Sequence, residues 1–319
     1  MKNRYYITII IALLTLVSCQ KEELYTGPCN VRLRLAMQEE VSVTRAPEYK
    51  PISNAIPEFT AELFVSDGTR AGSSTMTWDG DMVNANLKLE EGTYNFYGYM
   101  PKRGGASFDL NTQKMTIPDI AGFDKENAML IKGNTPLVIN AGDKTGSTTL
   151  HMDHLMAKVT PYFYVHDEYA KMRTIKIKKV QFSMSDAATY TATVDYSTTP
   201  PTTTWQGGAT AAVELTTFED ESSPKVLDQG ADTKGEALST EYFYLCPAQS
   251  TANLKMTVTY DVYDKKGEVT RENVTADNAI LKLKDGDLKA GTNYKLYIKV
   301  VPTYLYVLSD NDEPVLIIP

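Results

Sequence analysis

Histidines and cysteines are the side chains whose spacing could support chemistry in this 319-residue sequence. His151, Asp153 and His154 form the densest group of possible metal ligands. Two histidines three residues apart make an incomplete site without further partners, so a core or hinge role is the simpler interpretation. No Gly-x-Ser-x-Gly elbow, phosphate-binding glycine loop or Cys-x-x-Cys pair occurs. The sequence therefore predicts neither an enzyme nor a bound metal or cofactor.

Cys19 differs because its surroundings specify a reaction. Lys2 and Arg4 precede a mostly apolar run over residues 7–17, and Leu-Val-Ser leads directly into the cysteine. A basic start, a short apolar core and a small-residue exit make an export signal, whereas a membrane span needs about 20 apolar residues. Leu-Val-Ser-Cys resembles the bacterial lipobox, in which the cysteine is acylated and becomes the first mature residue. We predict a lipoprotein signal peptide at 1–18; the alternative is an ordinary secretory signal.

Composition narrows the possible partners. A net charge of −8 and a pI near 5.1 argue against nucleic acid, since phosphate binding needs a basic surface. Two other cysteines, Cys29 and Cys246, could pair in an exported protein, although their separation in sequence says nothing about proximity. Two free, buried thiols are the alternative.

Hydrophobic alternation predicts strands along most of the chain. Val31, Leu33, Leu35 and Met37 alternate with arginines, as in a half-buried strand. The other clear cases are listed here: Ala61 to Val65, Tyr94 to Met100, Leu254 to Val262, and Tyr294 to Val300. The apolar positions change phase at Lys178-Lys179, which predicts a β-bulge.

Few segments depart from this pattern. We expect about one turn of helix between Asp124 and Leu130, and polar connections at Ser197–Gly208 and Phe218–Gly235. Turn signals at regular intervals favour an all-β sandwich or barrel architecture. Enough residues follow the signal for two domains, and the strand pattern restarts after His154.

The carboxyl end is unusually apolar. Two β-type segments follow Pro302, namely Tyr304-Leu305-Tyr306-Val307-Leu308 and Val315-Leu316-Ile317-Ile318. Exposed apolar strands at a terminus promote aggregation unless another surface receives them. They either complete their own domain or insert into another molecule.

Several short motifs, in this order, resemble the fimbrillins, the subunits of type V pili of Bacteroidetes. They are the lipobox ending at Cys19, the strand at Val31–Met37, Thr44-Arg45-Ala46, His154-Leu155-Met156-Ala157-Lys158-Val159, and Ala290-Gly291-Thr292-Asn293-Tyr294. The resemblance implies two tandem transthyretin-like β-sandwich domains after the signal peptide. We place them at 46–153 and 154–302, between a lipidated segment at 19–45 and a tail at 303–319.

The resemblance also implies how such a chain assembles. The precursor would be held at the outer membrane by lipid on Cys19, then cut between Arg45 and Ala46 by an arginine-specific protease. The strand Val31–Met37 would leave, and both tail segments of another subunit would fill its place. The product would be a head-to-tail homo- or heteropolymer, a fimbrium at the cell surface that supports adhesion to a host or bacterial ligand. Arg32, Arg34 and Arg70 are alternative cleavage sites.

The sequence leaves three alternatives to compare: an anchor or tip subunit of a pilus, a glycan-binding surface lipoprotein, and a hydrolase. A pilus anchor would keep its lipid and leading strand, and a tip subunit typically lacks a free tail. A glycan-binding lipoprotein of a nutrient-uptake system would need exposed aromatic platforms, for which Trp78 and Trp205 are the main candidates. A hydrolase would need a constellation of catalytic residues that the sequence lacks.

Overall fold

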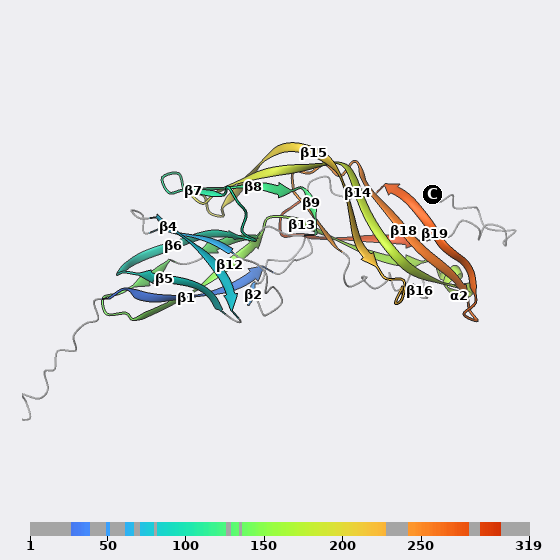
Figure 1. Cartoon of the computed structure of the whole chain (residues 1–319), viewed down its shortest axis with the longest axis horizontal. Helices are drawn as coiled ribbons and strands as arrows, with labels where there is room; N and C mark the ends of the chain where they lie inside the picture. The colour runs from blue at the N-terminus through green and yellow to red at the C-terminus, as the bar shows by residue number, and fades with distance from the viewer. Residues whose placement is uncertain are drawn as a thin grey trace, which may run out of the picture.

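The chain folds into an elongated, almost entirely β molecule, with its first strands at one end and its last strands at the other (Figure 1). The computed structural model describes residues 27–38, 49–51, 61–66, 71–79, 82–125, 129–133, 136–227, 242–280 and 288–300. The predicted all-β class is confirmed. No helix within these residues is long and apolar enough to cross a membrane.

The first sheet contains the amino-terminal strands. Its order is β10 (Met129–Gly133), β12 (Thr145–His154), β1 (Cys29–Gln38), β5 (Met82–Leu89), β4 (Ala71–Asp79), β3 (Ala61–Ser66), β6 (Gly92–Met100) and β11 (Leu137–Ile139), with β2 (Tyr49–Pro51) beside β1. Since β10 pairs with both β12 and β6, the pairing closes on itself. β1 therefore lies inside this sheet, with a neighbour on each side.

Two further sheets form the rest of the molecule. One has the order β20 (Asn293–Val300), β13 (Ala157–Val165), β17 (Phe243–Leu245) and β9 (Phe123–Asp124). The other has the order β19 (Val269–Ile280), β18 (Leu254–Asp264), β14 (Arg173–Asp195), β8 (Lys114–Ala121) and β7 (Ser107–Asp109), with β15 (Thr202–Glu219) and β16 (Lys225–Leu227) also on β14. A single described helix, α2 (Asp167–Met172), follows β13.

The alternating segments form the strands expected of them. Burial alternates along β1, β3 and the first part of β18, with apolar residues inside. The pairing of β14 with β18 shifts between Ile177 and Lys179, which confirms the predicted bulge. The bulge lets Lys178 reach Asp261 at 3.5 Å and donate to Asn273 Oδ1 at 2.7 Å. A one-residue insertion thus switches which face of β14 is apolar.

Two sequence expectations were wrong. Asp124 belongs to β9, Lys125 is a bend, and Met129 and Leu130 belong to β10, so the described residues of the segment expected to form a turn of helix are not helical; residues 126–128 lie outside the described part. The polar connection expected at Ser197–Gly208 is largely strand, because β15 begins at Thr202. The connection expected at Phe218–Gly235 contains a turn at residues 220–224 between β15 and β16, and its residues 228–235 lie outside the described part. β15 needs no apolar period, since its backbone pairs with β14 while residues 206–212 are exposed.

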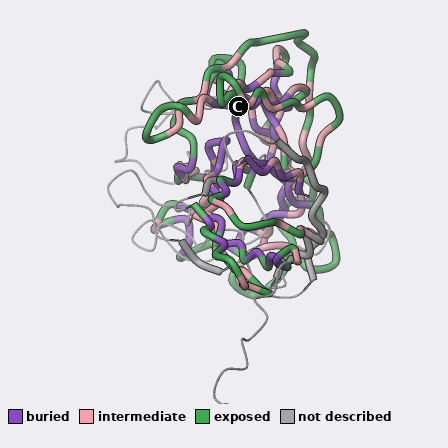
Figure 2. Tube along the Cα trace, turned by 90° about the vertical axis from the view of Figure 1, so that its left-hand side faces the viewer, coloured by how far each residue is buried: buried purple, intermediate pink, exposed green. Residues whose placement is uncertain are grey.

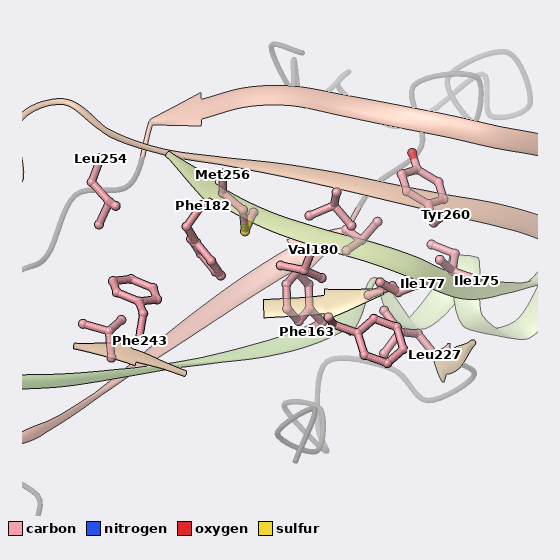
Figure 3. Packing of buried hydrophobic residues seen from close by; sticks show 14 of the residues in the cluster. Phe163, Ile175, Ile177, Val180, Phe182, Leu227, Phe243, Leu254, Met256 and Tyr260 are labelled. Atoms are coloured by element: carbon pink, nitrogen blue, oxygen red, sulfur yellow. The ribbon is translucent and has the colours of Figure 1, made fainter. Parts of the chain in front are cut away.

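Three hydrophobic clusters hold the sheets together. Figure 2 shows in purple which parts of the chain are buried. One lies inside the amino-terminal sheet, and one lies between β13, β14, β18 and β20, with Phe163, Phe182 and Phe243 near its centre (Figure 3). The third contains Met115 and Ile117 of β8, together with Tyr190 of β14. Strand pairing between β8 and β14 crosses the predicted 153/154 boundary, so the two halves share this middle cluster. The division into domains stays a prediction.

Candidate strand-exchange site

β1 contains the strand that the sequence nominates for exchange. Asn30 to Met37 pairs in parallel with residues 145–152 of β12, while Cys29 to Leu33 pairs antiparallel with β5. A strand with partners on both sides satisfies its backbone donors and acceptors within the sheet. Its loss would leave two facing strand edges about 10 Å apart, since neighbouring strands lie about 4.8 Å apart.

The inner face of β1 is deeply buried. Leu33 is 0% exposed and Leu35 is 4% exposed, whereas Arg32 and Arg34 point outward. Burying an aliphatic side chain contributes about 1.5–3 kcal/mol, so Val31, Leu33 and Leu35 together contribute on the order of 5–9 kcal/mol before ordering costs. We call the place that β1 occupies between β12 and β5 the slot. It fits a strand with an apolar side chain at every second position.

The end of β1 meets the second half of the molecule. Gln38 lies against Gly291, where an added Cβ would come within 2.9 Å of the Gln38 side-chain oxygen. Gly291 has a φ of +70°, a conformation that glycine adopts without strain, and its N–H donates to Met156 O at 3.0 Å. Thus β1 starts toward the amino-terminal end of the molecule (Figure 1), and its Gln38 end abuts the turn before β20.

Part of the predicted machinery lies outside the described residues. Arg45 and Ala46 fall between β1 and β2, which pair with each other through Met37 and Lys50. The tail at 303–319 follows β20 and is also outside them, as are Cys19 and Arg70. The roles given to these residues stay predictions.

The two halves repeat one arrangement. β13, the first strand after β12, pairs in parallel with β20 and antiparallel with β17. In addition, the Thr160 hydroxyl donates to Asn293 Oδ1 at 2.9 Å, and Lys158 N donates to Thr292 O at 2.9 Å. In each half, then, the first strand lies beside the last.

The remaining candidate side chains do not form a site. His151 and His154 are three apart on β12, and strand alternation puts them on opposite faces. No group of three potential metal ligands occurs within the described part of the chain. Trp205 is half-buried and packs edge-to-face on Tyr190 at 6.2 Å, so it covers the middle cluster; the Trp78 side chain is outside the described set.

Cys29 and Cys246 are both free and buried, in separate clusters. Burial raises the pKa of the Cys29 thiol, with a smaller contribution from Asp143. Burial also raises the pKa of Cys246 to about 12, although backbone hydrogen bonds from Ala248 and Gln249 lower this pKa in part. Both thiols are protonated at neutral pH, which makes them poor nucleophiles.

The sequence did not predict which strands flank β1. They are β12, in parallel, and β5, antiparallel, and pairing between segments far apart in sequence leaves no local pattern. The order of the strands, rather than any catalytic group, makes this region a candidate site.

A model of the family described as fimbrillin-like matches residues 53–313. The chain belongs to this family. Among solved structures, the fimbrillin-like chain is similar to candidate cell adhesion proteins of Bacteroides uniformis and Bacteroides ovatus. The first is 14% identical, with 84% of this chain and 93% of that chain covered and a TM-score of 0.43. The second is 12% identical, with 86% and 92% covered and a TM-score of 0.47.

A fimbrial protein of Bacteroides ovatus is 11% identical, with 86% of the fimbrillin-like chain and 50% of that chain covered and a TM-score of 0.35. No curated protein matches this sequence.

Proposed function

We propose that this fimbrillin-like protein is a non-enzymatic structural subunit of a type V pilus that polymerises by strand exchange. It is exported as a lipoprotein acylated at Cys19, and it is cut after Arg45. The strand Val31–Met37 then leaves, and the tail of another subunit occupies its slot. The polymer supports adhesion. Membership of the fimbrillin-like family favours this function over those of a hydrolase or a nutrient-uptake protein.

The observation that carries the proposal is the position of β1. It is an interior strand of the sheet, yet it begins the described chain and is followed by the segment that contains Arg45. Before cleavage, covalent linkage keeps the local concentration of β1 in the millimolar range or above. A cut at Arg45 turns its pairing into a bimolecular contact. An incoming strand that is tethered to a whole subunit can then replace it.

Replacement conserves the interactions of the slot. The incoming strand regains backbone hydrogen bonds with both β12 and β5, and its alternate side chains refill the apolar positions. Five apolar tail side chains would contribute on the order of 7–15 kcal/mol before ordering costs. Because the tail and the slot are different surfaces, the contact is head-to-tail and propagates into a filament.

An arginine-specific protease tests the proposal on the purified precursor. We expect a single early cut that yields Ala46 as the new first residue, loss of the fragment that contains β1, and growth in particle size. Mass spectrometry reads the first residue, and light scattering follows size. An Arg45→Lys variant should resist the cut, and a chain lacking Thr303–Pro319 should be cut but stay monomeric. Fibres from that truncated chain would overturn the proposal.

A further inference from the structure

Large apolar side chains that remain exposed gather at the two ends of the molecule. Six are exposed among the described residues, and four of them lie at the ends. Val138 is 56% exposed, Val226 52%, Val269 43% and Met172 42%. Single exposed apolar residues are common on protein surfaces, so their position along the long axis is the informative observation.

Three of them form what we call the carboxyl-end surface: Met172, Val226 and Val269. Met172 ends α2, and Val226 pairs with Lys176 near the start of β14. Val269 pairs with Tyr263 beside the turn between β18 and β19. These elements meet at the end of the molecule that carries α2 (Figure 1).

β20, the last described strand, ends at this same end. β20 runs parallel to β13 and its last residue, Val300, pairs with Val165, immediately before the His166 cap of α2. Only three residues separate Val300 from Tyr304. Val300 and Tyr304 are thus four steps apart in the chain and lie at most about 14 Å from each other when it is extended. If Tyr304 enters a neighbouring slot, the mouth of that slot must lie close to the carboxyl-end surface.

The mouth of the slot lies at the opposite end of the molecule. Cys29 pairs with Leu89, and β6 starts close by at Gly92, opposite Ile139. Val138 therefore lies beside this mouth, on what we call the amino-end surface. The other end of the slot meets Gly291, so an incoming strand enters from the Cys29 end.

We propose that the carboxyl-end surface of one subunit packs on the amino-end surface of the next, as a second contact besides the inserted strand. This rests on the proposed strand exchange, and the occupant is a second copy of this chain. The contact covers Val138 on one side and Met172, Val226 and Val269 on the other. It fixes the angle between consecutive subunits, which a single flexible strand does not.

Charge does not oppose this contact. Lys225, Lys265 and Lys266 lie at the carboxyl end, and Glu90, Glu91 and Asp143 lie at the amino end. Each end also carries the opposite sign, through Asp264 and Glu268 at one and Lys88 and Lys144 at the other. The mixed charges can pair across the junction, whereas two ends of a single sign would repel.

Cysteine cross-linking of cleaved, polymerised protein tests the contact. A Val138→Cys/Val269→Cys double variant places both thiols at every junction, while the two sites lie at opposite ends of one molecule. Cys29 leaves with β1, and Cys246 is 0% exposed. With a short bis-maleimide, we expect a ladder of covalent oligomers about tenfold or more above that of a Val138→Cys/Ala209→Cys control, because neighbours hold the thiols at high local concentration. Ala209 lies on the exposed part of β15.

The outcomes separate the two proposals. A ladder in the polymer and none in the uncut precursor supports the end-to-end contact. Val138→Cys is also combined with Met172→Cys and with Val226→Cys. If polymers form but none of the three pairs gives more cross-linked product than the control, the contact is wrong and strand exchange stands. If the cleaved protein forms no polymer, strand exchange fails and the contact fails with it.

Discussion

The first strands of the two halves, β1 and β13, have nearly the same surroundings. Each pairs in parallel with the last strand of its half and antiparallel with another strand. Each presents apolar side chains to a cluster, such as Leu33 on β1 and Phe163 on β13, both 0% exposed. Burial and pairing alone would assign both strands the same role.

Chain connectivity separates them. β13 continues from β12 through Leu155 and Met156 and leads into α2, so no single cut in the chain frees it. β1 is the first described strand, and the proposed cut after Arg45 falls between β1 and β2. In the proposed exchange, β1 would therefore leave because the chain is cut beside it, although it is paired on both sides as β13 is.

Two core truncations give the largest expected effects and test this difference. Leu33→Ala should destabilise the precursor by about 2–5 kcal/mol. If the proposed cleavage removes β1, the same substitution should leave the cleaved polymer unchanged. Phe163→Ala should destabilise precursor and polymer alike, by about 3–5 kcal/mol. Urea denaturation of both forms measures each change.

If Leu33→Ala weakens the polymer as much as the precursor, then β1 stays in the mature subunit, as in a lipid-retaining anchor. The unmodified chain, carried through the same cleavage, is the control.

A second substitution tests how far the two halves are separate at all. Gly122 joins them, since its N–H donates to Ala188 O at 2.8 Å and its carbonyl accepts from Cys246 N at 2.8 Å. A Cβ there would lie 2.6 Å from the Tyr190 ring and 2.7 Å from both Ala188 O and Gln249 Oε1. Gly122→Ala should therefore destabilise the protein by about 1–3 kcal/mol.

The matched control for Gly122→Ala is Gly104→Ala, where an added Cβ meets nothing within 4 Å. Calorimetry should show Gly122→Ala splitting or broadening the unfolding transition while Gly104→Ala keeps it unchanged. A single sharp transition in both variants, at the same temperature, would show that the middle cluster does not couple the halves.

Much of the strand content was predictable from the sequence, but the partners of the strands were not. Period-two alternation predicts β1 and β18 because one face of each is buried. The phase change at Lys178 likewise predicts its bulge. Alternation says which residues face inward and nothing about the neighbouring strand, so the pairing of β1 with β12 and of β8 with β14 could not be derived.

Other elements carry too little local signal. β15 lacks an apolar period because most of its side chains are exposed, and α2 is a single short helix capped by the His166 side chain. For the candidate site, physical reasoning gave the buried face of β1 and the unusually apolar tail. The resemblance to fimbrillins added the cut at Arg45 and the exchange of β1 for the tail. The slot itself arises from strand order, which no local pattern encodes.

The smallest expected effect concerns the side-chain hydrogen bond that ties β13 to its parallel partner. Thr160 is 9% exposed and donates to Asn293 Oδ1 at 2.9 Å. Thr160→Val keeps the shape but removes the donor, which should cost about 0.5–1.5 kcal/mol. If the end of β20 opens locally, hydrogen exchange of its amides should rise by about two- to twelvefold. Thr210→Val, on the exposed part of β15, is the matched control. Equal exchange in both variants would mean that the Thr160–Asn293 hydrogen bond does not hold the end of β20, and that its backbone pairing with β13 suffices.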